Sequence, residues 1–284
     1  MDISETNEGI EVKTSSYRLF LERAGGFAAR QVEIFGPGRL DRFDRPGEGP
    51  HPTCMHFDNM TVNNTFQLAH YGKINESVTA SVDGSQLKLS GHLIPIIEGT
   101  SGSVSIEKTM RFEDDMYDVD VHLRFEDTGP IDFASVWWDV HDKWLRAMRS
   151  SAGVFMPLQV GIGDSCDDDL HKSFRPMTDM NRGAGVWIEM IGDSASIMAA
   201  LRSPEPDQFP AGGMKYWDGP DDADAGEGVS HGCINLDLIN CELSGAEPLD
   251  IEDLQCAYRV FLSGPTVVRS APRTEHGSGQ ARSD

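Results

Sequence analysis

The sequence lacks any apolar run near the roughly 20 residues that a membrane-spanning helix requires. Its opening, MDISETNEGIEV, is acidic and has no apolar core, so it does not resemble a secretory signal peptide. We therefore expect a cytoplasmic protein without a membrane partner. GxSxG, P-loop and HExxH motifs are also missing, which disfavours a serine hydrolase, a nucleoside triphosphatase and a zincin-type metalloprotease.

Basic residues are scarce. The chain has 24 Lys and Arg against 46 Asp and Glu, a formal net charge of -22, and only seven of the basic residues are Lys. Nucleic acids and anionic membrane surfaces bind basic patches, so neither is an expected partner. Self-repulsion on this scale disfavours folding at low ionic strength and is screened beyond about 3 Å in molar salt. We hypothesise a halophilic source with a salt-rich cytoplasm; the alternative is an acidic protein of a mesophile.

Cysteine is limited to five residues, an odd number without a CxxC pair: Cys54, Cys166, Cys233, Cys241 and Cys256. This set argues against a disulfide-stapled scaffold and fits reduced, mostly buried thiols. Cys241 and Cys256 fall on neighbouring predicted strands, but a cytoplasmic setting disfavours a disulfide between them.

Helical periodicity is missing as well, whereas the alternation typical of β-strands recurs along the chain. Residues 117–125 alternate strictly between apolar and polar, and residues 104–112 do so with one lapse at Lys108. An acidic turn separates these two segments, and DTGP leads from the second into residues 131–141. We therefore predict that the three segments form an antiparallel meander.

Further strands are predicted at 12–22, 27–35, 61–69, 77–82, 86–97, 151–158, 186–190, 195–201, 234–243 and 254–262. Residues 36–52, 159–184 and 203–230 show no period and are predicted to be irregular loops. Ten to thirteen strands joined by hairpins, with little helix, predict an all-β antiparallel sandwich. The length allows one domain over residues 1–265, and the polar residues 266–284 are predicted to form a flexible tail.

Two stretches resemble segments of the galactose mutarotase-like superfamily of supersandwich domains. YRLFLERAGGFAARQVEIFG is similar to the opening strand-turn-strand of these domains, with its Gly-Gly turn. SVSIEKTMRFEDDMYDVDVHLRF is similar to their central strand pair, in which a charged turn separates two alternating strands. The resemblance implies a concave sheet face that binds carbohydrate. The superfamily includes aldose epimerases, which use a His as acid and a carboxylate as base, but also lyase and hydrolase domains and non-catalytic modules, so no single reaction is implied.

The densest group of chemically capable residues is Trp137, Asp139, His141 and Lys143, which share one face if the third strand of the meander extends that far. An aromatic ring suits the apolar face of a sugar, and the polar groups suit its hydroxyls. Histidine is the side chain whose unperturbed pKa lies nearest neutrality, so a residue such as His141 suits acid-base chemistry there. The alternative is a solvated strand face whose Trp packs against the next sheet.

A second group lies in GEGVSHGC, where glycines flank Glu227 and follow His231 and would let the backbone approach a ligand closely. A surface loop whose His caps a turn is the alternative. If the two groups converge, His141 and His231 would form an acid-base pair, or a divalent metal site with Glu227 or Asp139. Otherwise no cofactor is expected.

Weaker candidates surround these groups. His122 and Arg124 would contact the same ligand if the strand register of the meander brings them beside Trp137. Trp217, in a predicted loop, and His70 are further candidates for substrate binding. HPTCMHFD, at 51–58, contains metal-ligand residue types but no fixed-spacing signature.

Taken together, these features predict a carbohydrate-active protein that binds a sugar or uronate on a concave sheet face, as an epimerase or lyase that works by proton abstraction. A non-catalytic carbohydrate-binding or accessory module is one alternative. An isomerase or hydratase of an apolar small molecule is another, which the 12 Met would permit. The sequence does not indicate the oligomeric state.

Overall fold

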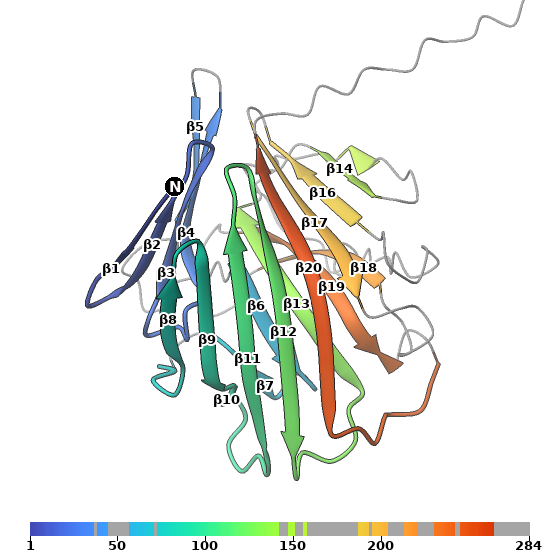
Figure 1. The fold of residues 1–284 in the computed structure, drawn as a ribbon. Helices are drawn as coiled ribbons and strands as arrows, with labels where there is room; N and C mark the ends of the chain where they lie inside the picture. The colour runs from blue at the N-terminus through green and yellow to red at the C-terminus, as the bar shows by residue number, and fades with distance from the viewer. Residues whose placement is uncertain are drawn as a thin grey trace, which may run out of the picture.

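The protein is described by a computed structural model, which covers residues 1–36, 39–44, 57–70, 73–141, 147–150, 156–157, 187–192, 195–203, 213–220, 230–241 and 245–263. These residues form two antiparallel β-sheets of eleven and nine strands. The nine-stranded sheet lies in front of the eleven-stranded sheet in Figure 1. The predicted all-β antiparallel sandwich is confirmed.

The eleven-stranded sheet contains β1 (Asp2–Glu5), β2 (Gly9–Lys13), β3 (Tyr17–Glu22), β4 (Ala29–Gly36), β5 (Arg39–Asp44), β6 (Phe57–Val62), β7 (Phe66–Gln67), β10 (Ile94–Pro95), β13 (Phe133–His141), β18 (Gly213–Pro220) and β19 (Ser230–Asn240). Its main path runs β1-β2-β3-β4-β6-β13-β19-β18. The central strands β6, β13 and β19 are therefore contributed by segments far apart in the sequence.

The nine-stranded sheet contains β8 (Thr79–Asp83), β9 (Gln86–His92), β11 (Ser103–Phe112), β12 (Met116–Glu126), β14 (Ala147–Ser150), β15 (Met156–Pro157), β16 (Trp187–Ile191), β17 (Ser196–Ser203) and β20 (Asp253–Ser263). Its order is β15-β14-β16-β17-β20-β12-β11-β9-β8. The predicted hairpins β8-β9, β11-β12 and β16-β17 are all present.

The predicted meander is wrong at its third strand. β12 pairs with β20, while β13 crosses to the other sheet and pairs with β6 and β19. The burial of β13 gives the physical reason: Ala134, Ser135 and Val136 are consecutive and all fully buried. A strand buried on both faces fits the centre of a covered sheet.

Other strand boundaries also differ from the prediction. β5 lies within the segment predicted as a loop at 36–52, and β18 lies within 203–230. The strand predicted at 61–69 is split into β6 and β7 by Asn63 and Asn64, whose φ angles of 50° and 48° are left-handed. Asn tolerates that conformation better than most residues because its side chain is short and polar. The predicted tail and the 159–184 loop lie outside the described residues.

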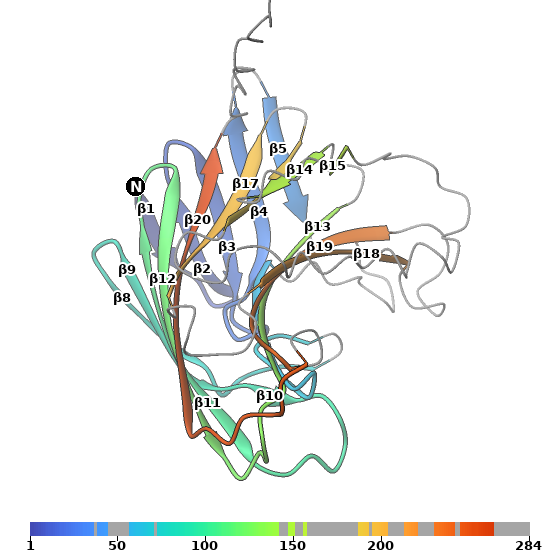
Figure 2. The same cartoon turned by 90° about the vertical axis from the view of Figure 1, so that its right-hand side faces the viewer.

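Both partners of β13 carry an additional residue: the register against β19 shifts between Ala134 and Ser135, where Leu238 of β19 is skipped, and the register against β6 shifts between Trp137 and Trp138. Bulges of this kind bend a strand and increase its twist. Accordingly, β13, β18 and β19 bend away from β11, β12 and β20 in Figure 2. No helix among the described residues is long and apolar enough to cross a membrane.

Candidate functional site

Two of the predicted groups meet on neighbouring strands. His141 of β13 is the direct register partner of His231 of β19, Asp139 is the partner of Cys233, and Trp137 is the partner of Asn235. Directly opposed residues of antiparallel strands lie on the same sheet face, and alternate residues of one strand also share a face. Trp137, Asp139, His141 and His231 therefore occupy positions on one face of the eleven-stranded sheet.

That face is the one turned away from the second sheet. Trp138, on the opposite face of β13, is fully buried and packs edge-on against Tyr258 of the nine-stranded sheet, with ring centroids 5.4 Å apart. Trp137 is only half-buried, and its indole Nε1 has no hydrogen-bond partner among the described residues. A buried donor without a partner costs roughly 1–3 kcal/mol.

β18 is a third strand beside β13 and β19, and the sequence did not predict it. Trp217 is the register partner of Cys233 and so stands in line with Asp139, while Lys215 stands in line with Asn235 and Trp137. Lys215 and Asn235 were missed as candidates. Their signal was the position two residues from Trp217 and Cys233, which becomes informative only once β18 and β19 are recognised as paired strands.

Asn59 of β6 completes the Trp137 row on the other side. Its side chain is fully buried, donates from Nδ2 to the carbonyl of Ala69 at 2.9 Å and accepts from the Ala69 N–H at Oδ1 at 3.0 Å. These two hydrogen bonds fix Ala69, the residue before His70, next to Asn59. His70 Nδ1 lies 3.0 Å from Gln67 Oε1, and burial, followed by the charge of Lys73, lowers the pKa of His70.

His122 and Arg124 do not join this face. They lie on β12, where their neighbours Val121 and Leu123 face the core, so both side chains lie on the outer face of the nine-stranded sheet. There His122 Nε2 lies 3.7 Å from Asp253 Oδ2, and Arg124 Nη2 lies 3.3 Å from a carboxylate oxygen of Glu107. The prediction that they stand beside Trp137 is wrong, because β12 and β13 belong to different sheets.

No protein-family model and no curated protein sequence matches the chain. Solved structures do match its fold. The crystal structure of a candidate aldose 1-epimerase from Escherichia coli K12 aligns with a TM-score of 0.52 and 12% identity, over 89% of this chain and 98% of that one. A galactose mutarotase-like protein from Lactobacillus casei ATCC 334 gives a TM-score of 0.52 and 10% identity, over 89% and 99%. This chain has the galactose mutarotase-like fold.

The galactose mutarotase-like resemblance of residues 17–36 and 103–125 is thus confirmed for the fold, and these segments form β3-β4 and β11-β12. Other predicted residues of the site cannot be placed on it. Lys143, Glu227 and residues 51–56 lie outside the described residues. Asp139, His141, Trp217 and His231 are placed by strand register alone, so their roles stay predictions.

Among the described residues, no group of three or more His, Cys, Asp or Glu is suitably placed to hold a metal ion. Cys241 and Cys256 are both buried. Burial raises the pKa of Cys256 to about 12, which makes it an inert thiol.

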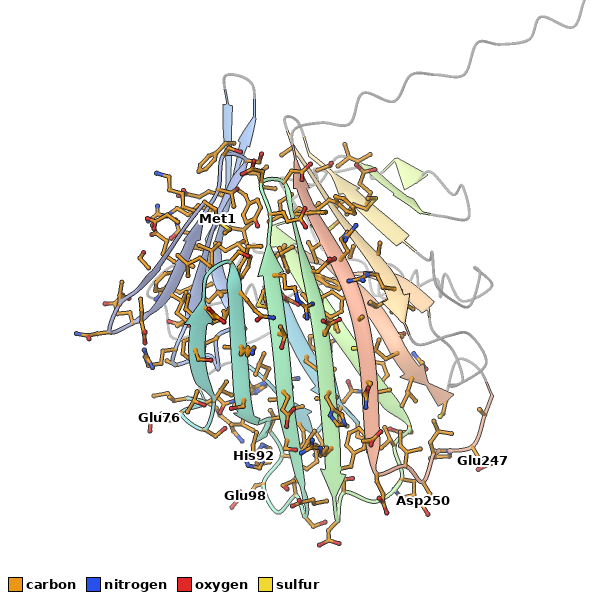
Figure 3. All side chains as sticks on the ribbon, in the orientation of Figure 1. Met1, Glu76, His92, Glu98, Glu247 and Asp250 are labelled. Atoms are coloured by element: carbon orange, nitrogen blue, oxygen red, sulfur yellow. The ribbon has the colours of Figure 1, made fainter. Side chains whose placement is uncertain are left out.

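A hollow of about 680 Å³ lies at the end of β12 and the start of β20, lined by residues 124–129 and 250–253. Five of its ten lining residues are acidic, and the hollow lies at the ends of strands of the nine-stranded sheet, whereas Trp137 belongs to the other sheet. Figure 3 shows Asp250 there at the same end of the molecule as Glu76, Glu98 and Glu247. Asp and Glu side chains are usually exposed to solvent, so the acidic lining of this hollow is explained by solvation and does not indicate a ligand.

Proposed function

We propose that this protein binds a sugar on the outer face of β13, β18 and β19 and catalyses epimerisation at a ring carbon. One observation carries the proposal: His141 and His231 are direct register partners on a bent part of the sheet. Directly opposed residues have Cβ atoms about 4.5–5.5 Å apart, which lets two imidazoles reach one sugar ring. The sheet face also carries an aromatic and a carboxylate position next to this pair.

The proposed chemistry assigns a role to each position. The rings of Trp137 and Trp217 stack against the apolar face of the sugar, and Lys215 and Asn235 bind its hydroxyls. One imidazole donates a proton to the ring oxygen while Asp139 or Glu227 accepts the proton of the anomeric hydroxyl. The bond between the anomeric carbon and the ring oxygen then breaks to give the open-chain aldehyde. After rotation the hydroxyl attacks the other face of the aldehyde, and both protons return, so no atom is gained or lost.

The fold supports the choice of reaction class. The Escherichia coli protein that shares it is described as a candidate aldose 1-epimerase. Ring opening and closure also require only proton transfers, for which the positions His141, His231 and Asp139 are suited without a cofactor. A sugar or uronate is accordingly the proposed ligand. Met60, Met110 and Met190 are buried in the core.

The test measures mutarotation by polarimetry for freshly dissolved α-galactose, α-glucose and glucuronate, with His141→Ala, His231→Ala and the double variant. General acid-base groups typically contribute about 10²–10⁴-fold, so the single variant that removes the proton-donating imidazole should lose at least about 100-fold in turnover, and the double variant should lose at least as much. His122→Ala is the matched control because it removes the same side chain from the other sheet. It should leave turnover unchanged.

Two results would overturn the proposal. If the double variant keeps wild-type turnover on a sugar that the protein interconverts, the histidine pair is not the catalyst. If the protein binds sugars saturably but converts none, it is a non-catalytic carbohydrate-binding module. In that case Trp137→Ala should weaken binding while His141→Ala changes it little.

A further inference from the structure

The irregularity between β6 and β13 is a bulge formed by one residue, Asp58. Trp137 pairs with Asn59 and Trp138 pairs with Phe57, so Asp58 is the additional residue of β6. Its φ angle is 62°, in the left-handed region that bulges usually fill with Gly. An Asp in this conformation is strained unless its surroundings hold it there.

Those surroundings are a buried polar cluster in the core. Lys108 Nζ lies 2.9 Å from Asp58 Oδ2, and both side chains are only 2% exposed. The same Nζ donates to the backbone carbonyl of Asp58 at 3.2 Å. Tyr258 donates its hydroxyl to Asp58 Oδ1. Lys108 therefore holds both the side chain and the main chain of the bulge residue.

The cluster joins the two sheets directly below the proposed sugar-binding face. Asp58 belongs to β6 of the eleven-stranded sheet, whereas Lys108 and Tyr258 belong to β11 and β20 of the other. Tyr258 also packs against Trp138, the immediate neighbour of Trp137. Lys108, the single lapse in the alternation of its strand, thus occupies a core position because its charge has a partner there.

We propose that Asp58 and Lys108 act as a positioning clamp for the face that carries Trp137. The clamp holds the left-handed bulge in place, and the bulge lets Phe57 and Asp58 both face the core while Asn59 turns outward into the Trp137 row. A slip of one residue would reverse the faces of these side chains. The binding part of this inference rests on the proposed function, whereas its structural part does not.

An ion pair suits this role better than an apolar pair. Burying two charges costs desolvation, and apolar residues of the same size would often be as stable, so the pair is not explained by stability alone. A charged amine held by a carboxylate and a carbonyl of one residue fixes direction as well as distance. The clamp therefore selects one conformation of the bulge among those that an apolar core would accept.

The main test uses the double variant Asp58→Gly/Lys108→Met, which leaves no unpaired buried charge and places Gly where φ is positive. Its readout is the indole N–H resonance of Trp137 in nitrogen-15 NMR spectra, assigned by its loss in Trp137→Phe. We expect that resonance to shift and its exchange with deuterium to accelerate roughly tenfold or more, while circular dichroism still shows a folded β-protein. Affinity for galactose or glucuronate should fall roughly tenfold, the scale of one lost aromatic contact.

Two further variants make the outcome decisive. Asp58→Asn/Lys108→Met keeps a residue that tolerates left-handed φ and still accepts from Tyr258, so it should restore part of the Trp137 signal and should fold if the Gly variant does not. Glu107→Gln/Arg124→Met removes an exposed pair of the same sheet, 59% and 55% exposed, and should change neither readout.

An unchanged Trp137 resonance and exchange rate in Asp58→Gly/Lys108→Met overturns the clamp, and if that variant does not fold, the same result in Asp58→Asn/Lys108→Met overturns it. If the wild-type protein binds neither sugar, the proposed function fails, but the Trp137 resonance still decides the clamp. A shifted resonance with unchanged sugar affinity overturns the link between the clamp and the binding face.

Discussion

Replacing Lys108 alone by Met should be one of the most damaging single changes in the core. The residue Asp58 is only 1% exposed, and the substitution removes the cation that pairs with its carboxylate. An uncompensated buried charge of this kind costs about 3–5 kcal/mol. At roughly 2–4 °C per kcal/mol for a chain of this size, the melting temperature should fall by roughly 6–20 °C. Urea unfolding followed by tryptophan fluorescence gives the free energy directly.

A double-mutant cycle separates the lost ion pair from other effects. Asp58→Gly/Lys108→Met should be less destabilised than Lys108→Met alone, because no charge is then buried without a partner and Gly relieves the left-handed strain. Arg124→Met, which breaks an exposed pair, should cost about 1 kcal/mol or less. A cost below about 1 kcal/mol for Lys108→Met, or a double variant that is the sum of its singles, would refute this reasoning.

Three further changes have definite expected outcomes. Gly102→Ala and Gly99→Ala both place Ala at φ near 80°, but only the new Cβ at position 102 would lie 2.5 Å from the Asp127 carbonyl oxygen. Urea unfolding should therefore show that Gly102→Ala lowers the free energy of unfolding by about 1–3 kcal/mol more than Gly99→Ala does. Arg259 lowers the pKa of Asp118, so the pair's stabilisation is complete above the ordinary Asp pKa and is lost as the pH falls through the lowered folded value. The gap in unfolding free energy between wild type and Asp118→Asn, about 1 kcal/mol at pH 7, should therefore close toward pH 2. Finally, the melting temperature should rise between low and molar KCl because the chain carries a net charge of -22, and a flat or falling curve would contradict a halophilic source.

The sequence predicted local features well, because strand alternation depends on neighbouring residues only. The pattern of 117–125 predicted both the β12 strand and its buried face. It did not predict which strand pairs with which, since a period of two identifies the faces of a strand but not its edges. That is why β13 was assigned to the sheet of β12, and why His122 was expected beside Trp137.

The same distinction applies to the candidate site. His141 was predicted from its residue type and its alternation with Trp137 and Asp139, and His231 from its residue type and its glycine neighbour; strand pairing places the two opposite each other. Lys215 could not be chosen, because its position is defined only by the pairing of β18 with β19. The lapse at Lys108 is visible in the sequence, but its partner is not, because Asp58 lies 50 residues away in a bulge that Gly usually forms.

The central place of β13 has a consequence for synthesis on the ribosome. Phe133 hydrogen-bonds to Asn63, 70 residues earlier, but Ser135 bonds to Leu236, 101 residues later. At about 5–20 residues per second, the nascent chain waits roughly 5–20 s before β19 emerges to cover the second edge of β13. During that interval an apolar strand with an open edge can pair with other chains, so slower expression or added chaperone should increase the yield of properly folded protein.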